Sequence, residues 1–152
     1  MGNNLIYTLL AVVAGIAVTV QGPINASLGK SLKSPDMATF WAFAGGTAVI
    51  AVYLLIKKEP LPSLDIITQT PIWAYLGAIT GLIYVSLVIF VTPHLGVGNT
   101  TILLLFAQIV TALLLDHFGA FGFTPKPINL IKIIGVSLMT GGVFLISRWW
   151  KK

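Results

Sequence analysis

Val20-Gln21-Gly22-Pro23-Ile24-Asn25 lies inside the first long apolar run of the chain, residues 5–32. This run is long enough to cross a bilayer as a helix, since a span needs about 20 mostly apolar residues. Two amides and a proline inside such a run are costly unless other groups compensate for them. We therefore expect this stretch to do more than face lipid.

The composition of the whole chain is that of a membrane protein. Of its 152 residues, 57% are hydrophobic and only 9% are charged, whereas soluble domains carry about 25% charged residues. The net charge of +5 does not indicate nucleic acid, because the basic residues stand singly or in pairs at the ends of apolar runs, as membrane-flanking charges do. The chain has no cysteine, which excludes disulfides and thiolate metal sites.

Five apolar runs predict five transmembrane helices. They are too long for strands and lack the period-two alternation of a barrel. We expect an all-α membrane protein with a single transmembrane domain over residues 1–152. Its predicted spans cover about residues 5–32, 37–56, 72–91, 99–115 and 128–146. Ser34-Pro35-Asp36 is a favourable helix start, and Thr92-Pro93-His94-Leu95-Gly96 predicts a stop between the third and fourth spans.

Small residues predict where helices approach closely, because they let backbones pack. The pattern recurs in three pairs, Ala42 with Gly46, Gly77 with Gly81, and Gly135 with Gly142. Intramolecular packing is the expected role of most of them. The fifth span, with few polar residues and many glycines, is also a candidate for a subunit contact.

The distribution of basic residues leaves the orientation open. With the N-terminus outside, the inner side would hold five of them and the outer side four. A positive-inside bias is normally more lopsided. Dual topology, in which copies insert both ways, and a single N-out orientation are the two alternatives. Five spans cannot divide into two inverted repeats, so inverted symmetry would require a second chain, giving an antiparallel homodimer of ten helices.

Polar side chains inside the spans form a candidate substrate site. Gln21 and Asn25 are four residues apart and share a helix face. Gln108 lies in the middle of the fourth span, with Thr111 on roughly the same face. The candidates for substrate binding are Gln21, Asn25, Gln108, Tyr84, Trp41 and Thr111. Alternatively, the amides bond only each other or a carbonyl freed by Pro23, but such bonds contribute on the order of 0.6 kcal/mol.

Gly22 and Pro23 are candidates for gating, because a proline loosens the helix around it. Asp116 and His117 are the titratable pair near a span end and are candidates for proton coupling. The simpler interpretation of that pair is that it ends the helix in water. The sequence contains no carboxylate pair, metal-ligand spacing, nucleophile triad or phosphate loop. We therefore expect neither an enzyme nor a cofactor.

Three motifs carry a resemblance to a known family: Gln21-Gly22-Pro23-Ile24-Asn25-Ala26, Pro93-His94-Leu95-Gly96, and Gln108 followed by Asp116-His117-Phe118-Gly119-Ala120-Phe121-Gly122. With these motifs the whole chain resembles the YdcZ-like inner-membrane exporters, five-helix members of the drug/metabolite transporter superfamily. The resemblance implies a multi-pass protein of the bacterial inner membrane that moves small solutes. Pairs of opposite orientation in that family favour the antiparallel homodimer.

The superfamily also includes small multidrug-resistance transporters, which use a glutamate in the first helix to exchange protons for cationic drugs. This chain has only Gln21 and Asn25 there, a departure that argues against antiport by the same route. We expect an alternating-access exporter of a small solute, with an amide-lined site near mid-membrane at the dimer interface. The alternatives are a non-transporting membrane subunit of a larger complex and a lipid or amphiphile flippase. The expected partners are a small-molecule substrate, membrane lipid and a second copy of the chain.

Overall fold

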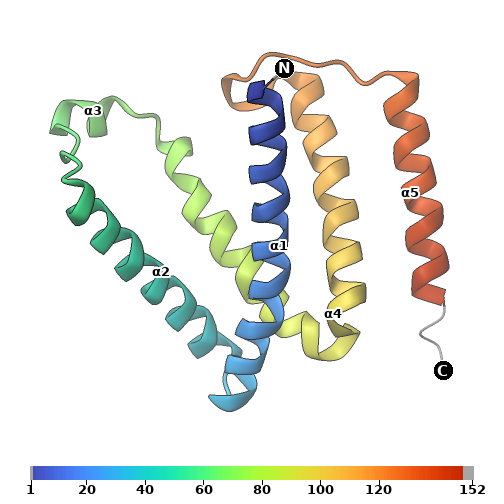
Figure 1. Cartoon of the computed structure of the whole chain (residues 1–152), viewed down its shortest axis with the longest axis horizontal. Helices are drawn as coiled ribbons and strands as arrows, with labels where there is room; N and C mark the ends of the chain where they lie inside the picture. The colour runs from blue at the N-terminus through green and yellow to red at the C-terminus, as the bar shows by residue number, and fades with distance from the viewer. Residues whose placement is uncertain (1, 149–152) are drawn as a thin grey trace. The chain divides into compact units, whose positions relative to one another are not determined.

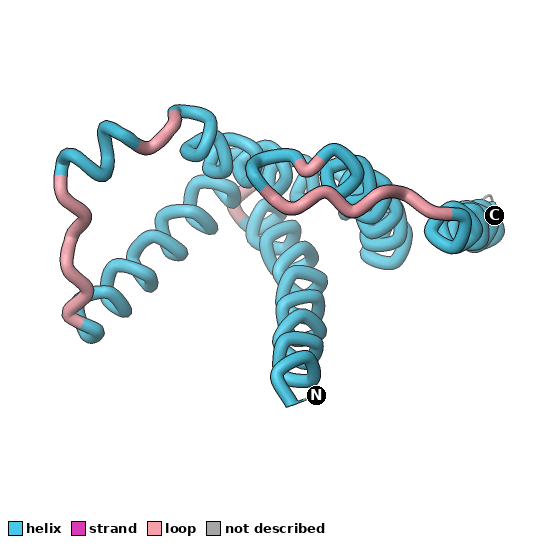
Figure 2. The backbone as a smooth tube through the Cα atoms, turned by 90° about the horizontal axis from the view of Figure 1, so that it is seen from above, coloured by secondary structure: helices cyan, strands magenta, loops and turns pink. Residues whose placement is uncertain are grey.

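A computed structural model describes residues 2–148 of the chain (Figure 1). Every regular element in this range is helical, and short connections join the helices (Figure 2). The prediction of an all-α chain is confirmed for these residues. The chain divides into two compact units, and the boundary along the sequence falls between His94 and Leu95. A single transmembrane domain therefore stays a prediction.

The first unit begins with α1 (Gly2–Ser31), which contains all but the last residue of the first predicted span and continues through Pro23. Its end turns tightly into α2 (Pro35–Lys57) through Lys33, whose φ is 53°. The Ser34 hydroxyl accepts a hydrogen bond of 3.2 Å from the Met37 amide, and Pro35 occupies the first turn. A serine cap followed by proline satisfies the start of a helix. The predicted helix start at Ser34 is thus confirmed.

A connection with two short helices leads from α2 to α4. These are α3 (Leu64–Gln69), capped by Ser63, and the 3₁₀-helix η1 (Ile72–Leu76). The next helix, α4 (Gly77–Phe118), contains the fourth predicted span and all of the third except residues 72–76, which form η1. It is interrupted at Gly96, with φ 79° and ψ 161°. Only glycine adopts such angles readily. The five-residue stop predicted at Thr92–Gly96 is therefore a break at one residue, beside the boundary of the two units.

The core of the first unit lies where α1, α2 and the start of α4 meet. Its buried apolar side chains are Ala26, Ala38, Val88 and Ile89. A Cβ added to Gly22 would lie 3.1 Å from Val88 Cγ1, and one added to Gly29 would lie 3.2 Å from Ile89 Cγ2. Gly22, Ala26 and Gly29 share one face of α1. This small-residue face lets α4 approach closely, which is how helices associate in lipid.

The second unit contains the end of α4, the 3₁₀-helix η2 (Ala120–Gly122) and α5 (Leu130–Arg148). Gly119 ends α4 in the left-handed region with φ 59°. A Cβ there would lie 2.6 Å from Pro125 Cγ and 2.8 Å from the Phe123 carbonyl oxygen. The connection to α5 therefore folds back onto the end of α4 at a position that only glycine can occupy without strain.

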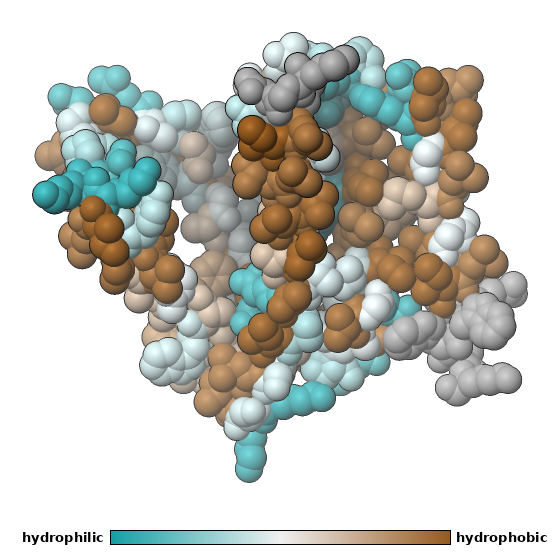
Figure 3. All heavy atoms as spheres, in the orientation of Figure 1, coloured by the Kyte–Doolittle hydropathy of each residue, from teal (hydrophilic) through white to brown (hydrophobic). Residues whose placement is uncertain are grey.

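The lengths and surfaces of the helices fit a bilayer. Three apolar segments are long enough to cross one, Leu5–Ser31, Pro35–Lys57 and Ile72–Phe118, and the third is long enough for two crossings. The apolar segment of α5, Leu130–Ile146, is shorter. Apolar side chains cover most of the visible face of α1, and hydrophilic ones gather at helix ends (Figure 3). Exposed apolar helices of this kind need lipid or further helices as neighbours.

Candidate functional site

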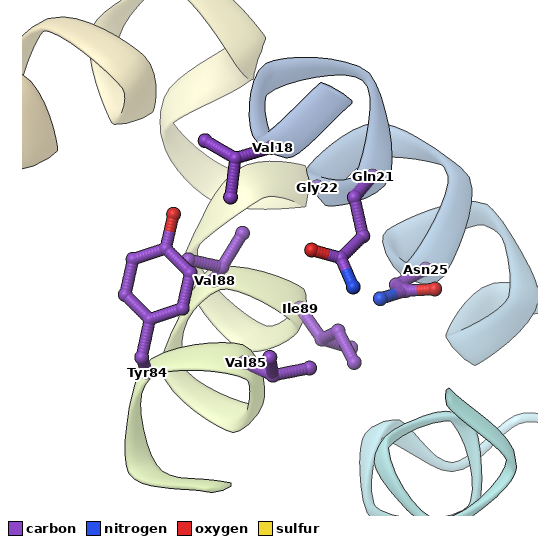
Figure 4. Close-up of a pocket in the computed structure, with 8 residues that line it drawn as sticks. All are labelled: Val18, Gln21, Gly22, Asn25, Tyr84, Val85, Val88 and Ile89. Atoms are coloured by element: carbon purple, nitrogen blue, oxygen red, sulfur yellow. The ribbon is translucent and has the colours of Figure 1, made fainter. Parts of the chain in front are cut away.

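Three of the predicted substrate-binding residues line one narrow crevice between α1 and the start of α4. Gln21 and Asn25 enter it from α1, and Tyr84 enters it from α4 (Figure 4). The other lining residues are Val18, Gly22, Val85, Val88 and Ile89. The crevice has room for about one water molecule. It is an approach of two helices with polar side chains on its walls.

The side-chain amides of Gln21 and Asn25 have no hydrogen-bond partner within residues 2–94. Asn25 is 8% exposed, yet none of the described side-chain polar atoms is both fully enclosed and unpaired. Its amide therefore stays accessible from the crevice. The Gln21 side chain extends from α1 toward the space that Val88 and Ile89 face (Figure 4). An accessible amide without a partner can bind a polar group that enters.

Gln21 also lines a second and larger cleft. There it faces α2, with Ala42, Phe43, Gly46 and Thr47 on the opposite wall. This cleft has a volume of about 330 Å³ and is open to its surroundings. Small-molecule sites measure about 300–1,000 Å³. Among the predicted site residues within residues 2–94, Gln21 therefore has access to a space large enough for a solute.

A third hollow is a groove between α2 and the start of α4, with a volume of about 480 Å³. Phe43 and Thr47 line both this groove and the second cleft. Asp36 stands in its wall at the start of α2, and Ser86 contributes a hydroxyl from α4. The Thr39 hydroxyl donates to the Pro35 carbonyl over 3.1 Å, so its lone pairs stay available. The groove thus combines apolar walls with a few polar groups.

The other predicted substrate residues lie elsewhere. Trp41 is on α2, 54% exposed, with its ring edge-on to Phe40 at 5.6 Å, and it lines none of the three hollows described above. Gln108 and Thr111 are exposed positions of α4 within the second unit. The structure brings Gln21, Asn25 and Tyr84 together, and the roles of Trp41, Gln108 and Thr111 stay predictions.

The predicted gating residues occupy the closest approach of α1 and α4. Gly22 is buried, with the space above its Cα filled by Val88. Pro23 follows within the continuous helix α1 and has no N–H to donate to the Thr19 carbonyl. The Thr19 hydroxyl donates to the Gly15 carbonyl over 2.9 Å. A helix that lacks one backbone hydrogen bond can bend at that point at low cost, and here the point lies beside the close contact of Gly22 with Val88.

The predicted proton-coupling pair lies at the end of α4. Asp116 is half-buried, and its carbonyl accepts hydrogen bonds from the amides of Gly119 at 3.3 Å and Lys126 at 2.7 Å. His117 Nδ1 accepts a bond of 3.1 Å from the Ile128 amide. Both residues therefore hold the connection that follows them. Proton coupling through this pair stays a prediction.

Phe43 and Val85 are cleft residues that the sequence analysis missed. Phe43 lines the second cleft together with Gln21, and Val85 lines both the narrow crevice and the second cleft. They resemble ordinary apolar residues of a span, and their role depends on contacts between helices far apart in sequence. The one available signal was the position of Phe43 one turn before Thr47.

The fold and its clefts define a multi-pass membrane protein without a metal centre among residues 2–148, where no cluster of three or more metal-binding side chains occurs. A family model described as "Putative inner membrane exporter, YdcZ" matches residues 6–145, so the chain belongs to this family. The match confirms the resemblance and the inner-membrane localisation. No curated protein and no solved structure matches the chain.

Proposed function

We propose that the chain is an alternating-access exporter of a small solute, in which the Gln21 amide binds substrate. The observation that carries the proposal is the position of Gln21 on the walls of both the narrow crevice and the 330 Å³ cleft. Because Gln21 lines both the narrow crevice and the open cleft, its side chain could remain hydrogen-bonded to a solute while the helices change their positions. Apolar walls with a few polar groups are typical of small-molecule sites.

Gly22 and Pro23 would serve as the flexible point of this cycle. Opening the α1–α4 crevice requires Gly22 to move away from Val88, and the missing backbone bond at Pro23 lowers the cost of bending α1. Asn25 and Tyr84, which share the crevice, would contact the solute only in the opened state. Gln108 and Thr111 keep their predicted roles as substrate-binding residues.

Replacing Gln21 by leucine should abolish most transport. Purified protein reconstituted in vesicles and tested against a panel of radiolabelled solutes should show flux of at least one of them. We expect Gln21→Leu to lower that flux by about tenfold or more, because one lost hydrogen bond to a buried polar group costs about 1–3 kcal/mol. Gln108→Leu should lower it as well.

Gln69→Leu is the matched control, because it makes the same chemical change at the end of α3, outside the three hollows. It should leave the flux unchanged. If Gln21→Leu transports as well as Gln69→Leu, the site assignment is wrong. If no solute of the panel moves in the wild-type vesicles and a partner protein co-purifies in fixed stoichiometry, the chain is a subunit of a larger complex.

A flippase is the second candidate function, because the α2–α4 groove is open and mostly apolar. A lipid chain could lie along Phe40, Phe43 and Leu82, with its head group near Asp36. The same vesicles containing a fluorescent phospholipid decide between the two functions. Rapid reorientation of the lipid without flux of soluble solutes would favour the flippase.

The proposed assembly is an antiparallel homodimer of a dual-topology chain. The near tie of basic residues and the odd number of helices support it. In such a dimer the second copy would supply the inverted repeat that a single chain of five spans lacks. A small residue pattern on α5, Gly135 with Gly142, leaves space for a neighbouring helix, since an added Cβ would meet no atom within 4 Å at either position.

Single cysteines introduced at Ser31 and Thr68 should each react with an impermeant thiol reagent from both sides of the membrane. The native chain has no cysteine, and both changes preserve every charge that sets the orientation. The two residues lie near opposite ends of α2, so each serves as the control for the other. Labelling of Ser31→Cys from one side only, with Thr68→Cys labelled from the other, would exclude dual topology.

A further inference from the structure

We propose that His117 is a pH-dependent latch: its neutral imidazole holds the connection between α4 and α5 closed, and protonation opens it. The contact that defines the latch joins the Ile128 amide to His117 Nδ1 over 3.1 Å. A backbone N–H can only donate, so Nδ1 must carry a lone pair. This bond therefore requires the neutral ring, with its proton on Nε2.

The remainder of the connection brings the partners of this bond together. The Lys126 amide donates to the Asp116 carbonyl over 2.7 Å, two residues before Ile128. Gly119, in its left-handed conformation, donates to the same carbonyl over 3.3 Å. The His117 ring lies edge-on to Phe118, with centroids 4.9 Å apart. The imidazole is thus positioned against the last turn of α4, and the connection closes on that turn at two successive points.

Protonation removes the acceptor and adds a positive charge to this connection. An imidazolium has donors at both nitrogens, so it would face the Ile128 N–H with a second donor. The other ionisable side chains of the connection and the adjoining helix turns are Asp116, Lys126 and Lys132. Lys132 Nζ donates to the carbonyls of Lys126 and Pro127, each over 3.3 Å.

The latch matters because burial does little to fix the part of α5 from residue 130 to residue 146. None of the residues from 130 to 146 is buried, so the connection largely determines where α5 begins. Loss of the His117–Ile128 bond would let the Lys126–Asn129 segment move and α5 reorient with it. Histidine is the side chain that changes charge between pH 5 and 8. This role is independent of whether the chain transports a solute.

Spin labels on the two helices test the latch directly. Leu114 on α4 and Leu138 on α5 are both exposed and can be replaced by cysteine in the cysteine-free chain. Dilution with unlabelled protein restricts the measured distances to single chains. Between pH 8 and pH 5 the distance distribution of the otherwise native protein should broaden. His117→Gln, whose amide oxygen can accept the Ile128 N–H without titrating, should keep a narrow distribution at both values.

Two further variants complete the experiment. His117→Phe removes the acceptor and should show the broad distribution already at pH 8. His94→Gln changes the other histidine of the chain, whose ring is tilted against that of Phe90 with centroids 5.4 Å apart. This variant should respond to pH as the native protein does. A native distribution that is the same at both pH values would overturn the latch. So would a pH response that persists in His117→Gln.

Discussion

Gly119→Ala is expected to lower the free energy of unfolding by about 3 kcal/mol. A left-handed backbone costs an alanine roughly 1–2 kcal/mol, and Gly119 has a φ of 59°. The added Cβ would also lie 2.6 Å from Pro125 Cγ and 2.8 Å from the Phe123 carbonyl oxygen. Moving a packed segment away from such an overlap costs roughly 1–3 kcal/mol. Reversible unfolding in mixed micelles, followed by tryptophan fluorescence, measures the change.

Gly122→Ala separates the two causes. Gly122 has a φ of 84°, but an added Cβ would meet no atom within 4 Å. This variant should lose only the backbone contribution, roughly 1–2 kcal/mol. Equal losses in the two variants would contradict the close packing of Pro125 on Gly119. Because His117 and Gly119 hold the same connection, Gly119→Ala should also broaden the α4–α5 distance at pH 8.

Gly29→Leu should be the second severe change, with a loss of about 2 kcal/mol. A Cβ at Gly29 would already lie 3.2 Å from Ile89 Cγ2, 3.5 Å from Pro35 Cα and 3.6 Å from Ala38 Cβ. A full leucine side chain has no space there, because Ile89 is 2% exposed and Ala38 is fully buried. The α1–α2 turn and the start of α4 would have to separate. The same unfolding measurement applies.

Gly15→Leu is the control on the same helix. An added Cβ at Gly15 would meet no atom within 4 Å, and leucine is favoured over glycine in a helix by up to about 1 kcal/mol. This variant should therefore be as stable as the native chain or slightly more stable. A loss at Gly15 as large as that at Gly29 would mean that helix–helix contact is not the cause.

The helix ends were predictable because their causes are local. The start of α2, with the Ser34 cap and Pro35 in the first turn, depends on neighbours within four residues. The break before the fourth span was also visible, since Pro93 and Gly96 both disturb a helix. The sequence did not show that the break would be confined to Gly96, because a proline such as Pro93 is tolerated where the helix around it is otherwise satisfied.

The spacing of small residues along the sequence could not predict which glycines pack closely against another helix. Within the first unit an added Cβ at Gly46 or Gly77 would meet no atom within 4 Å, and one at Gly81 would meet only Phe43, at 3.8 Å. Gly46 and Gly77 therefore do not mark close packing inside this unit, whereas Gly81 lies at an ordinary contact distance from Phe43. The close contacts occur at Gly22 and Gly29, with Ala26 between them. Small residues permit an approach, but the partner helix decides which of them is used.

For the candidate site, the sequence alone determined that uncharged amides lie inside apolar helices, because hydropathy and span length follow from composition and order. It also placed Gln21 and Asn25 on one face of α1, since that follows from the helical repeat. Only the tertiary structure decided that Gln21 lines two hollows and that His117 accepts the Ile128 amide. Both depend on which distant segments meet, and contacts between distant segments are not encoded in any local pattern.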